Sequence, residues 1–82
     1  MIVTILYFAA LRDVMGTGEE SVTLPPDVRT AAEFLRFLEG ARAALTGRLQ
    51  SARLARNERF AEPEEMLVAG DVLALIPPVA GG

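Results

Sequence analysis

The chain has 82 residues, of which 51% are hydrophobic and 23% charged, a balance typical of one folded domain with a packed core. It contains neither cysteine nor histidine, which excludes disulfides, thiolate metal sites, cysteine nucleophiles and the usual neutral-pH base. The formal net charge of -3 opposes the approach of polyanions, so we expect no nucleic-acid partner.

The first part of the chain predicts two strands with a short helical turn between them. Residues 2–8 are mostly β-branched and aromatic, and residues 9–15 fit a helical turn that Gly16 ends. Residues 21–24 alternate as a second strand until Pro25-Pro26 stops it, because proline cannot donate to a strand ladder. We expect the two strands to pair as a wide hairpin.

The middle of the chain predicts one main helix. Thr30 and Glu33 form the capping-box pattern, in which each side chain satisfies a backbone amide left free at a helix start. An apolar stripe at helical spacing follows, which consists of Phe34, Leu35, Leu38 and Ala41. Residues 43–51, interrupted by Gly47, indicate either a short helix or a loop.

The last part of the chain predicts a hairpin and a buried strand. Residues 53–56 and 59–61 alternate around Asn57-Glu58, and residues 68–71 make a turn. Residues 72–76 form an apolar run between that turn and the next two prolines, which is typical of a buried strand.

This order of elements predicts the α+β class and, within it, the β-grasp fold. The first and last strands should lie side by side and parallel in a mixed sheet, because the helix between them provides the long crossover that a parallel pair needs. One main helix then covers one face of the sheet, and the other face stays open. We expect a β-grasp domain over residues 1–76 and an extended tail over residues 77–82.

The end of the sequence carries the sharpest chemical signal, the dipeptide Gly81-Gly82. Pro77-Pro78 fixes an extended direction after the last strand, and six residues can reach ~20 Å, far enough to enter another protein's active site. Glycine lacks a β-carbon, so the tail can pass a narrow channel and leave its terminal carbonyl open to attack. Considered alone, the dipeptide is equally consistent with a stub that has no function.

The first strand predicts a docking surface beside this tail. Side chains alternate along a strand, so Val3, Ile5 and Tyr7 face one way while Thr4, Leu6 and Phe8 face the other. Leu6 and Phe8 would then lie beside Ala74 and Ile76 on the open face. An exposed apolar patch of this kind indicates a partner interface, although local closure of the core is the alternative.

Three segments resemble the small subunit family of molybdopterin synthase, which consists of ubiquitin-like sulfur carriers. These segments are Phe8-Ala9-Ala10-Leu11-Arg12 with Gly16, Gly70-Asp71-Val72, and Ile76-Pro77-Pro78-Val79-Ala80-Gly81-Gly82. Asn57 in the predicted hairpin turn also fits this family. The resemblance spans the chain, but its specific parts are the two ends.

The resemblance implies that Gly82, preceded by Gly81, is adenylated with ATP by a ubiquitin-activating-type enzyme and converted to a thiocarboxylate by a sulfur donor enzyme. The tail then enters the large synthase subunit, where cyclic pyranopterin monophosphate receives sulfur during molybdenum cofactor biosynthesis. Two small subunits flank a large-subunit dimer, and the catalytic groups belong to the large subunit. No cofactor is bound tightly. The residues expected to contact the partner are Leu6, Phe8, Ile76, Pro77, Pro78, Val79 and Ala80.

Several alternatives stay open. Sulfur carriers for thiazole, cysteine or tRNA thiolation also end in Gly-Gly, and a ubiquitin-like protein modifier or a plain binding domain fits the same pattern. Arg12 and Asp13 match a family position, and an ion pair on the helix surface is expected there in preference to a functional role. The acidic side chains Glu62, Glu64, Glu65 and Asp71 are expected to be a solvated face and not a metal site.

The chain is also expected to be cytoplasmic and to lack a membrane span. No apolar run reaches the roughly 18 residues that a span requires. The apolar start, residues 1–10, lacks the basic flank and the cleavable end of a signal peptide.

Overall fold

A five-stranded mixed sheet with helices on one face makes up residues 1–78, the part of the chain that the computed structural model describes. The elements before the crossover are β1 (Ile2–Tyr7), α1 (Ala9–Met15) and β2 (Glu19–Thr23). The remaining elements are α2 (Ala31–Ala41), the 3-10 helix η1 (Ala43–Leu45), β3 (Arg53–Arg56), β4 (Arg59–Phe60) and β5 (Val72–Ile76).

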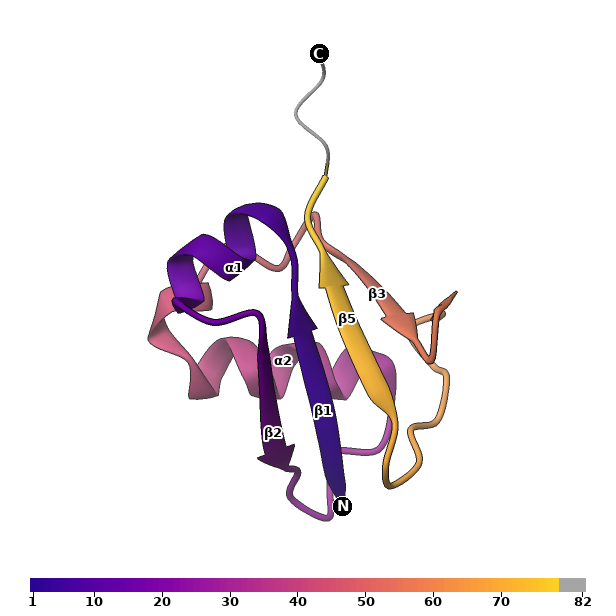
Figure 1. Ribbon diagram of the computed structural model, residues 1–82. Helices are drawn as coiled ribbons and strands as arrows, with labels where there is room; N and C mark the ends of the chain where they lie inside the picture. The colour runs from indigo at the N-terminus through magenta and orange to yellow at the C-terminus, as the bar shows by residue number, and fades with distance from the viewer. Residues whose placement is uncertain (79–82) are drawn as a thin grey trace.

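The strands lie in the order β2-β1-β5-β3-β4, so the first and last strands are central neighbours. β1 pairs parallel with β5, and each of these two strands pairs antiparallel with its outer neighbour, β2 or β3. Helix α2 crosses behind the sheet, and α1 lies at the end of the sheet where β1 and β5 finish (Figure 1). The parallel pair and the single covered face therefore confirm the predicted architecture.

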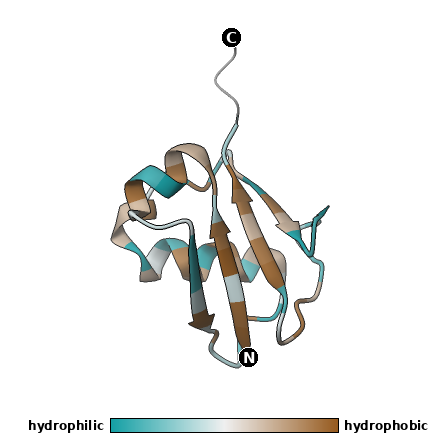
Figure 2. Ribbon diagram, viewed as in Figure 1, coloured by the Kyte–Doolittle hydropathy of each residue, from teal (hydrophilic) through white to brown (hydrophobic). Residues whose placement is uncertain are grey.

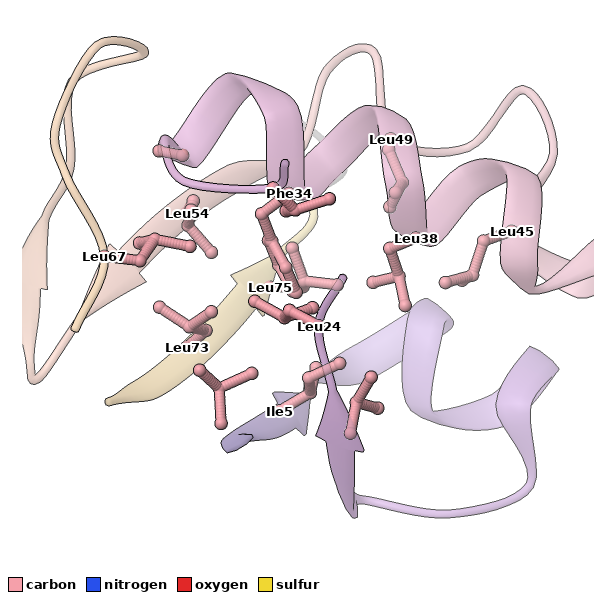
Figure 3. Close-up of a cluster of buried hydrophobic side chains, with 14 of the residues drawn as sticks. Ile5, Leu24, Phe34, Leu38, Leu45, Leu49, Leu54, Leu67, Leu73 and Leu75 are labelled. Carbon is pink, nitrogen blue, oxygen red and sulfur yellow. The ribbon is translucent and has the colours of Figure 1, made fainter. Parts of the chain in front are cut away.

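The core lies between α2 and the covered face of the sheet. Ile5, Leu73 and Leu75 point from the two central strands toward Phe34 and Leu38 of α2, and all five side chains are fully buried (Figure 3). Leu45 of η1 and Leu49 of the following loop close one side of this cluster. The segment 43–51, for which the sequence left helix and loop open, is thus a 3-10 turn followed by a loop, and each of the two supplies one core residue.

The capping box predicted at the start of α2 is confirmed. The Glu33 amide donates to the Thr30 hydroxyl at 3.2 Å, and the Thr30 amide donates to the Glu33 carboxylate at 2.9 Å. The predicted apolar stripe is wrong at Ala41, which is exposed because α2 ends there and the chain turns into η1. The stripe includes Ala31 instead, which is buried.

The predicted strands match the observed ones except at their ends. β2 begins at Glu19 and not at Ser21, because Glu19 and Glu20 pair with Leu6 and Ile5 of β1 despite their low strand propensity. The hairpin of β3 and β4 turns at Asn57-Glu58, where both residues have positive φ (51° and 71°), as the tight hairpin turn requires. The division into a domain 1–76 and a tail 77–82 stays a prediction.

We predict that Thr30→Ala lowers the free energy of unfolding by about 1 kcal/mol, because the Glu33 amide loses its acceptor. Urea denaturation of both proteins measures this difference. Thr30→Ser is the control, since it keeps the hydroxyl, and it should retain most of the stability. If Thr30→Ser were as unstable as Thr30→Ala, the loss of stability would come from the missing methyl group and not from the missing hydrogen bond.

Candidate functional site

The face of the sheet that α2 does not cover contains an apolar hollow of about 440 Å³, called here the open-face hollow. The two central strands that form its floor consist mostly of hydrophobic residues (Figure 2). Phe8 and Phe60 line it while 46% and 56% exposed, a large exposure for aromatic side chains. Its lining residues are Leu6, Phe8, Ala55, Asn57, Glu58, Phe60, Val72, Ala74 and Ile76.

The parallel register of β1 and β5 places the hollow at the start of the C-terminal segment. Leu6 pairs with Ala74, and Tyr7 pairs with Leu75 one step further along. Phe8 and Ile76 follow directly, and both line the hollow. β5 ends at Ile76, and the chain continues into Pro77-Pro78 from that edge of the sheet. A protein that binds the hollow would therefore be next to the origin of the glycine tail.

The predicted docking residues Leu6, Phe8 and Ile76 thus lie together on the open face, while Val3, Ile5 and Tyr7 are buried. Their role in partner binding stays a prediction. Pro77 is half-buried and Pro78 is exposed. Four residues of the predicted site lie outside the described residues, namely Val79, Ala80, Gly81 and Gly82.

Sequence reasoning missed the other wall of the hollow. Val72 belongs to the same alternating series as Ala74 and Ile76, so its place on the open face was available from the pattern. Phe60 and Ala55 form a cross-strand pair of the short hairpin and share that face. Phe60 is the aromatic residue of a hairpin sequence in which four of the eight residues 53–60 are charged, and this was the signal that it belongs to an exposed apolar surface.

Asp71 joins the hairpin turn to the start of β5 at one end of the hollow. Its buried carboxylate accepts hydrogen bonds from Arg56 Nε at 2.7 Å, from Asn57 Nδ2 at 2.9 Å and from the Val68 amide at 2.7 Å. Asn57 in turn accepts from the Val72 amide at 2.9 Å. The hairpin turn, in which Asn57 and Glu58 line the hollow, is therefore bonded to the start of β5, which forms part of the floor.

The charge of Asp71 is stabilised by these contacts. Burial alone raises the pKa of Asp71, but the hydrogen bonds from Arg56, the Val68 amide and Asn57 together hold that pKa below its ordinary value. Arg56 also bonds Glu65 at 3.1 Å, so two of the four acidic side chains considered for metal binding share one arginine. Within residues 1–78, no group of three or more histidine, cysteine or acidic side chains is arranged to hold a metal ion.

Comparison with known proteins then gives the family, because the model of the ThiS family matches residues 5–82. This chain belongs to the ThiS family. The molybdopterin synthase sulfur carrier subunit of Chlamydomonas reinhardtii is 33% identical over 84 residues, which cover 100% of both proteins.

Solved structures place this ThiS-family chain among ubiquitin-like proteins and confirm the β-grasp fold. SAMP1 of Haloferax volcanii, a small archaeal modifier protein, superposes with a TM-score of 0.85 at 33% identity and full coverage of both chains. A chain from the complex of subunits 1 and 2 of molybdopterin-converting factor from Helicobacter pylori superposes with a TM-score of 0.72. It is 24% identical, with 100% coverage of both chains, and this likeness concerns the fold alone.

A second polar cluster on the covered side of this ThiS-family chain is structural. Tyr7 donates its hydroxyl to Glu20, which also accepts from Arg42 at 2.8 Å, so β1, β2 and the end of α2 are joined. Burial, together with the bond to Glu20, raises the pKa of Tyr7 far above its ordinary value. Tyr7 therefore stays protonated and cannot act as a base at neutral pH.

Two further sequence expectations concern α1 and the membrane. Arg12 lies against Gly18 and forms no ion pair with Asp13 within the described part of the chain, so the expected pair is wrong. None of the helices within residues 1–78 has the length and apolar character to traverse a bilayer.

We predict that Asp71→Asn lowers the free energy of unfolding by about 1–3 kcal/mol at pH 7, because Arg56 loses one of its two charged acceptors and keeps only Glu65. A depressed folded-state pKa contributes stability above the unfolded pKa of about 3.9, and that contribution disappears as pH falls through the folded pKa. The gap between wild type and variant should therefore be constant above about pH 5 and narrow below about pH 4. Urea melts across this range test it, with Glu62→Gln, an exposed carboxylate change, as the control. A gap that does not change with pH would contradict the assigned charge.

Proposed function

We propose that this chain is the sulfur carrier subunit of a molybdopterin synthase and that Gly82 carries the sulfur. The observation that carries the proposal is the open-face hollow at the origin of a segment whose sequence ends in Gly81-Gly82. Membership of the ThiS family and relatives named molybdopterin synthase sulfur carrier subunits support it.

The proposed chemistry begins with activation of the Gly82 carboxylate. One carboxylate oxygen attacks the α-phosphorus of ATP, held by a ubiquitin-activating-type enzyme, and pyrophosphate leaves. A sulfur donor enzyme then supplies sulfur at the oxidation level of hydrosulfide, HS⁻, which adds to the acyl carbon. The C–S bond forms, AMP leaves, and the S–H proton passes to solvent. Adenylation makes this exchange possible because it turns a poor leaving group into a good one. The resulting thiocarboxylate is the donor to cyclic pyranopterin monophosphate.

The catalytic groups of the transfer step belong to the large subunit in this proposal. The chain has no histidine, cysteine or lysine, and its tyrosine is buried and held protonated. What it offers is position: the large subunit covers the open-face hollow, and the tail is delivered into the active site next to that contact. ATP is bound by the activating enzyme and not by this chain. We propose that the whole cycle takes place in the cytoplasm.

A ubiquitin-like protein modifier is the second candidate, and the likeness to SAMP1 at 33% identity favours it. Both candidates share the adenylated Gly82 and differ in the next nucleophile, which is sulfur for the carrier and a lysine amine for the modifier. Lysine-linked conjugates in cells would support the modifier. Recovery of a thiazole synthase by this chain would favour the carrier of a different thiolation pathway.

We predict that Phe8→Asp weakens binding to the large synthase subunit by tenfold or more, because a carboxylate would be buried in an apolar contact without a partner. Ile76→Asp should act in the same way. Both side chains lie on the open face, so thermal melts should stay near that of wild type. Ser21→Asp is the matched control, since Ser21 is exposed on β2 outside the hollow. Calorimetry that finds the affinity of Phe8→Asp unchanged contradicts the docking assignment.

We predict that deleting Gly82, or appending one alanine after it, abolishes sulfur transfer while binding to the large subunit stays nearly intact. Deletion moves the terminal carbonyl by ~3.5 Å, and a misplacement of ~1 Å can already cost ~100-fold in rate. No buried core residue within the described chain lies beyond Leu75, so we expect stability to change by less than ~0.5 kcal/mol. Molybdopterin yield is the assay. A deleted form that still makes molybdopterin near the wild-type rate would show that Gly82 is not the reactive residue.

A further inference from the structure

One arginine beside the open-face hollow, Arg53, has no role in the proposed docking function. The Arg53 guanidinium lies 3.8 Å from the centroid of the Phe60 ring, and Phe60 is a wall of the open-face hollow. Arg53 pairs in register with Ile76, so it stands on the strand next to the point where β5 ends. An arginine therefore borders the hollow at the end from which the C-terminal segment departs.

The charge of Arg53 is not neutralised within the part of the chain that the structure describes. Arg42 forms an ion pair with Glu20, and Arg56 forms ion pairs with Glu65 and Asp71. Arg53 is exposed, and no carboxylate of residues 1–78 lies within 4.0 Å of its guanidinium. Among residues 1–78 its contact is the Phe60 ring, and its guanidinium N–H groups donate to none of these residues. They can therefore donate to a partner.

We infer that Arg53 determines partner specificity, by selecting a protein that places a carboxylate opposite it when the open-face hollow is covered. This inference rests on the proposed function, and the partner is the large synthase subunit. A guanidinium suits this role because its planar fork can bond both oxygens of a carboxylate while its flat face stacks on a ring.

The stack on Phe60 prepares Arg53 for binding. A free arginine loses several rotatable bonds when a partner fixes it, and that loss weakens association. Here the ring already restricts the guanidinium before the partner arrives. Docking on the hollow would also remove water around the stack, which strengthens a charge-assisted hydrogen bond at this position.

A charge of opposite sign at the other end of the hollow fixes the direction in which the partner lies. Glu58 lines the hollow in the hairpin turn, and this turn lies beside the start of β5 because β3 and β5 are antiparallel. Arg53 lies beside the end of β5. A partner whose carboxylate lies near Arg53 binds favourably. If the same partner bound in the reversed direction, its carboxylate would face the like charge of Glu58. The same partner then always covers the hollow with its active site toward the tail.

The test is calorimetric titration of the purified large synthase subunit with wild type and charge variants at several salt concentrations. Arg53→Gln should raise Kd about tenfold or more and make the affinity less dependent on salt, because one charge pair is lost. Arg53→Lys should fall between the two, since it keeps the charge without the planar stack. Arg29→Gln is the matched control, because it removes the same charge from an exposed residue just before α2, and its Kd should equal that of wild type.

A second substitution separates the charge from the ring. Phe60→Leu keeps an apolar wall and removes the stack, so it should weaken binding, and adding Arg53→Gln to it should cost less than Arg53→Gln costs in wild type. Equal Kd and equal salt dependence for wild type and Arg53→Gln would overturn the role of Arg53 and leave the proposed function standing. A wild-type chain that does not bind the large subunit overturns both.

Discussion

Strands β1 and β5 run parallel at the centre of the sheet, so their carboxyl ends reach the same edge. This pairing places Phe8, which directly follows β1, next to the point where the chain leaves β5. Almost the whole chain separates these two points in sequence. The crossover that such a pair requires includes α2, which then covers the opposite face. One contact between strands therefore determines where the core, the open face and the origin of the tail lie.

The open face contains an exposed apolar hollow, and contiguous apolar surface of this kind marks an interaction site. At one end of the hollow, hydrogen bonds to Asp71 hold the hairpin turn in place. At the other end, the Arg53 guanidinium stacks on the Phe60 ring. In the function that we propose, a surface held in this way loses less entropy when the partner binds. The open-face hollow would dock the partner, Gly82 would carry the sulfur, and the catalytic groups would belong to the partner.

Local signals made most of the fold predictable from the sequence. The Thr30–Glu33 capping box, the strand-ending proline pair Pro25-Pro26 and the alternation in β1 and β5 each depend on neighbouring residues only. The failures are residues whose state depends on distant partners. Glu19 and Glu20 join β2 because β1 pairs with them, and Ala41 is exposed because the chain turns away. Asp71 was assigned to a solvated face, yet it is buried and accepts hydrogen bonds from Arg56 and Asn57.

The central claim is that this chain carries sulfur on Gly82, and intact-mass spectrometry tests it most directly. The purified chain is incubated with ATP, its adenylating enzyme and a sulfide source, and the products are compared with a reaction lacking ATP. The account predicts a species in which one oxygen is replaced by one sulfur, located at Gly82 by fragmentation and absent without ATP. An unchanged mass, with the adenylating enzyme shown to be active on another carrier, would contradict it.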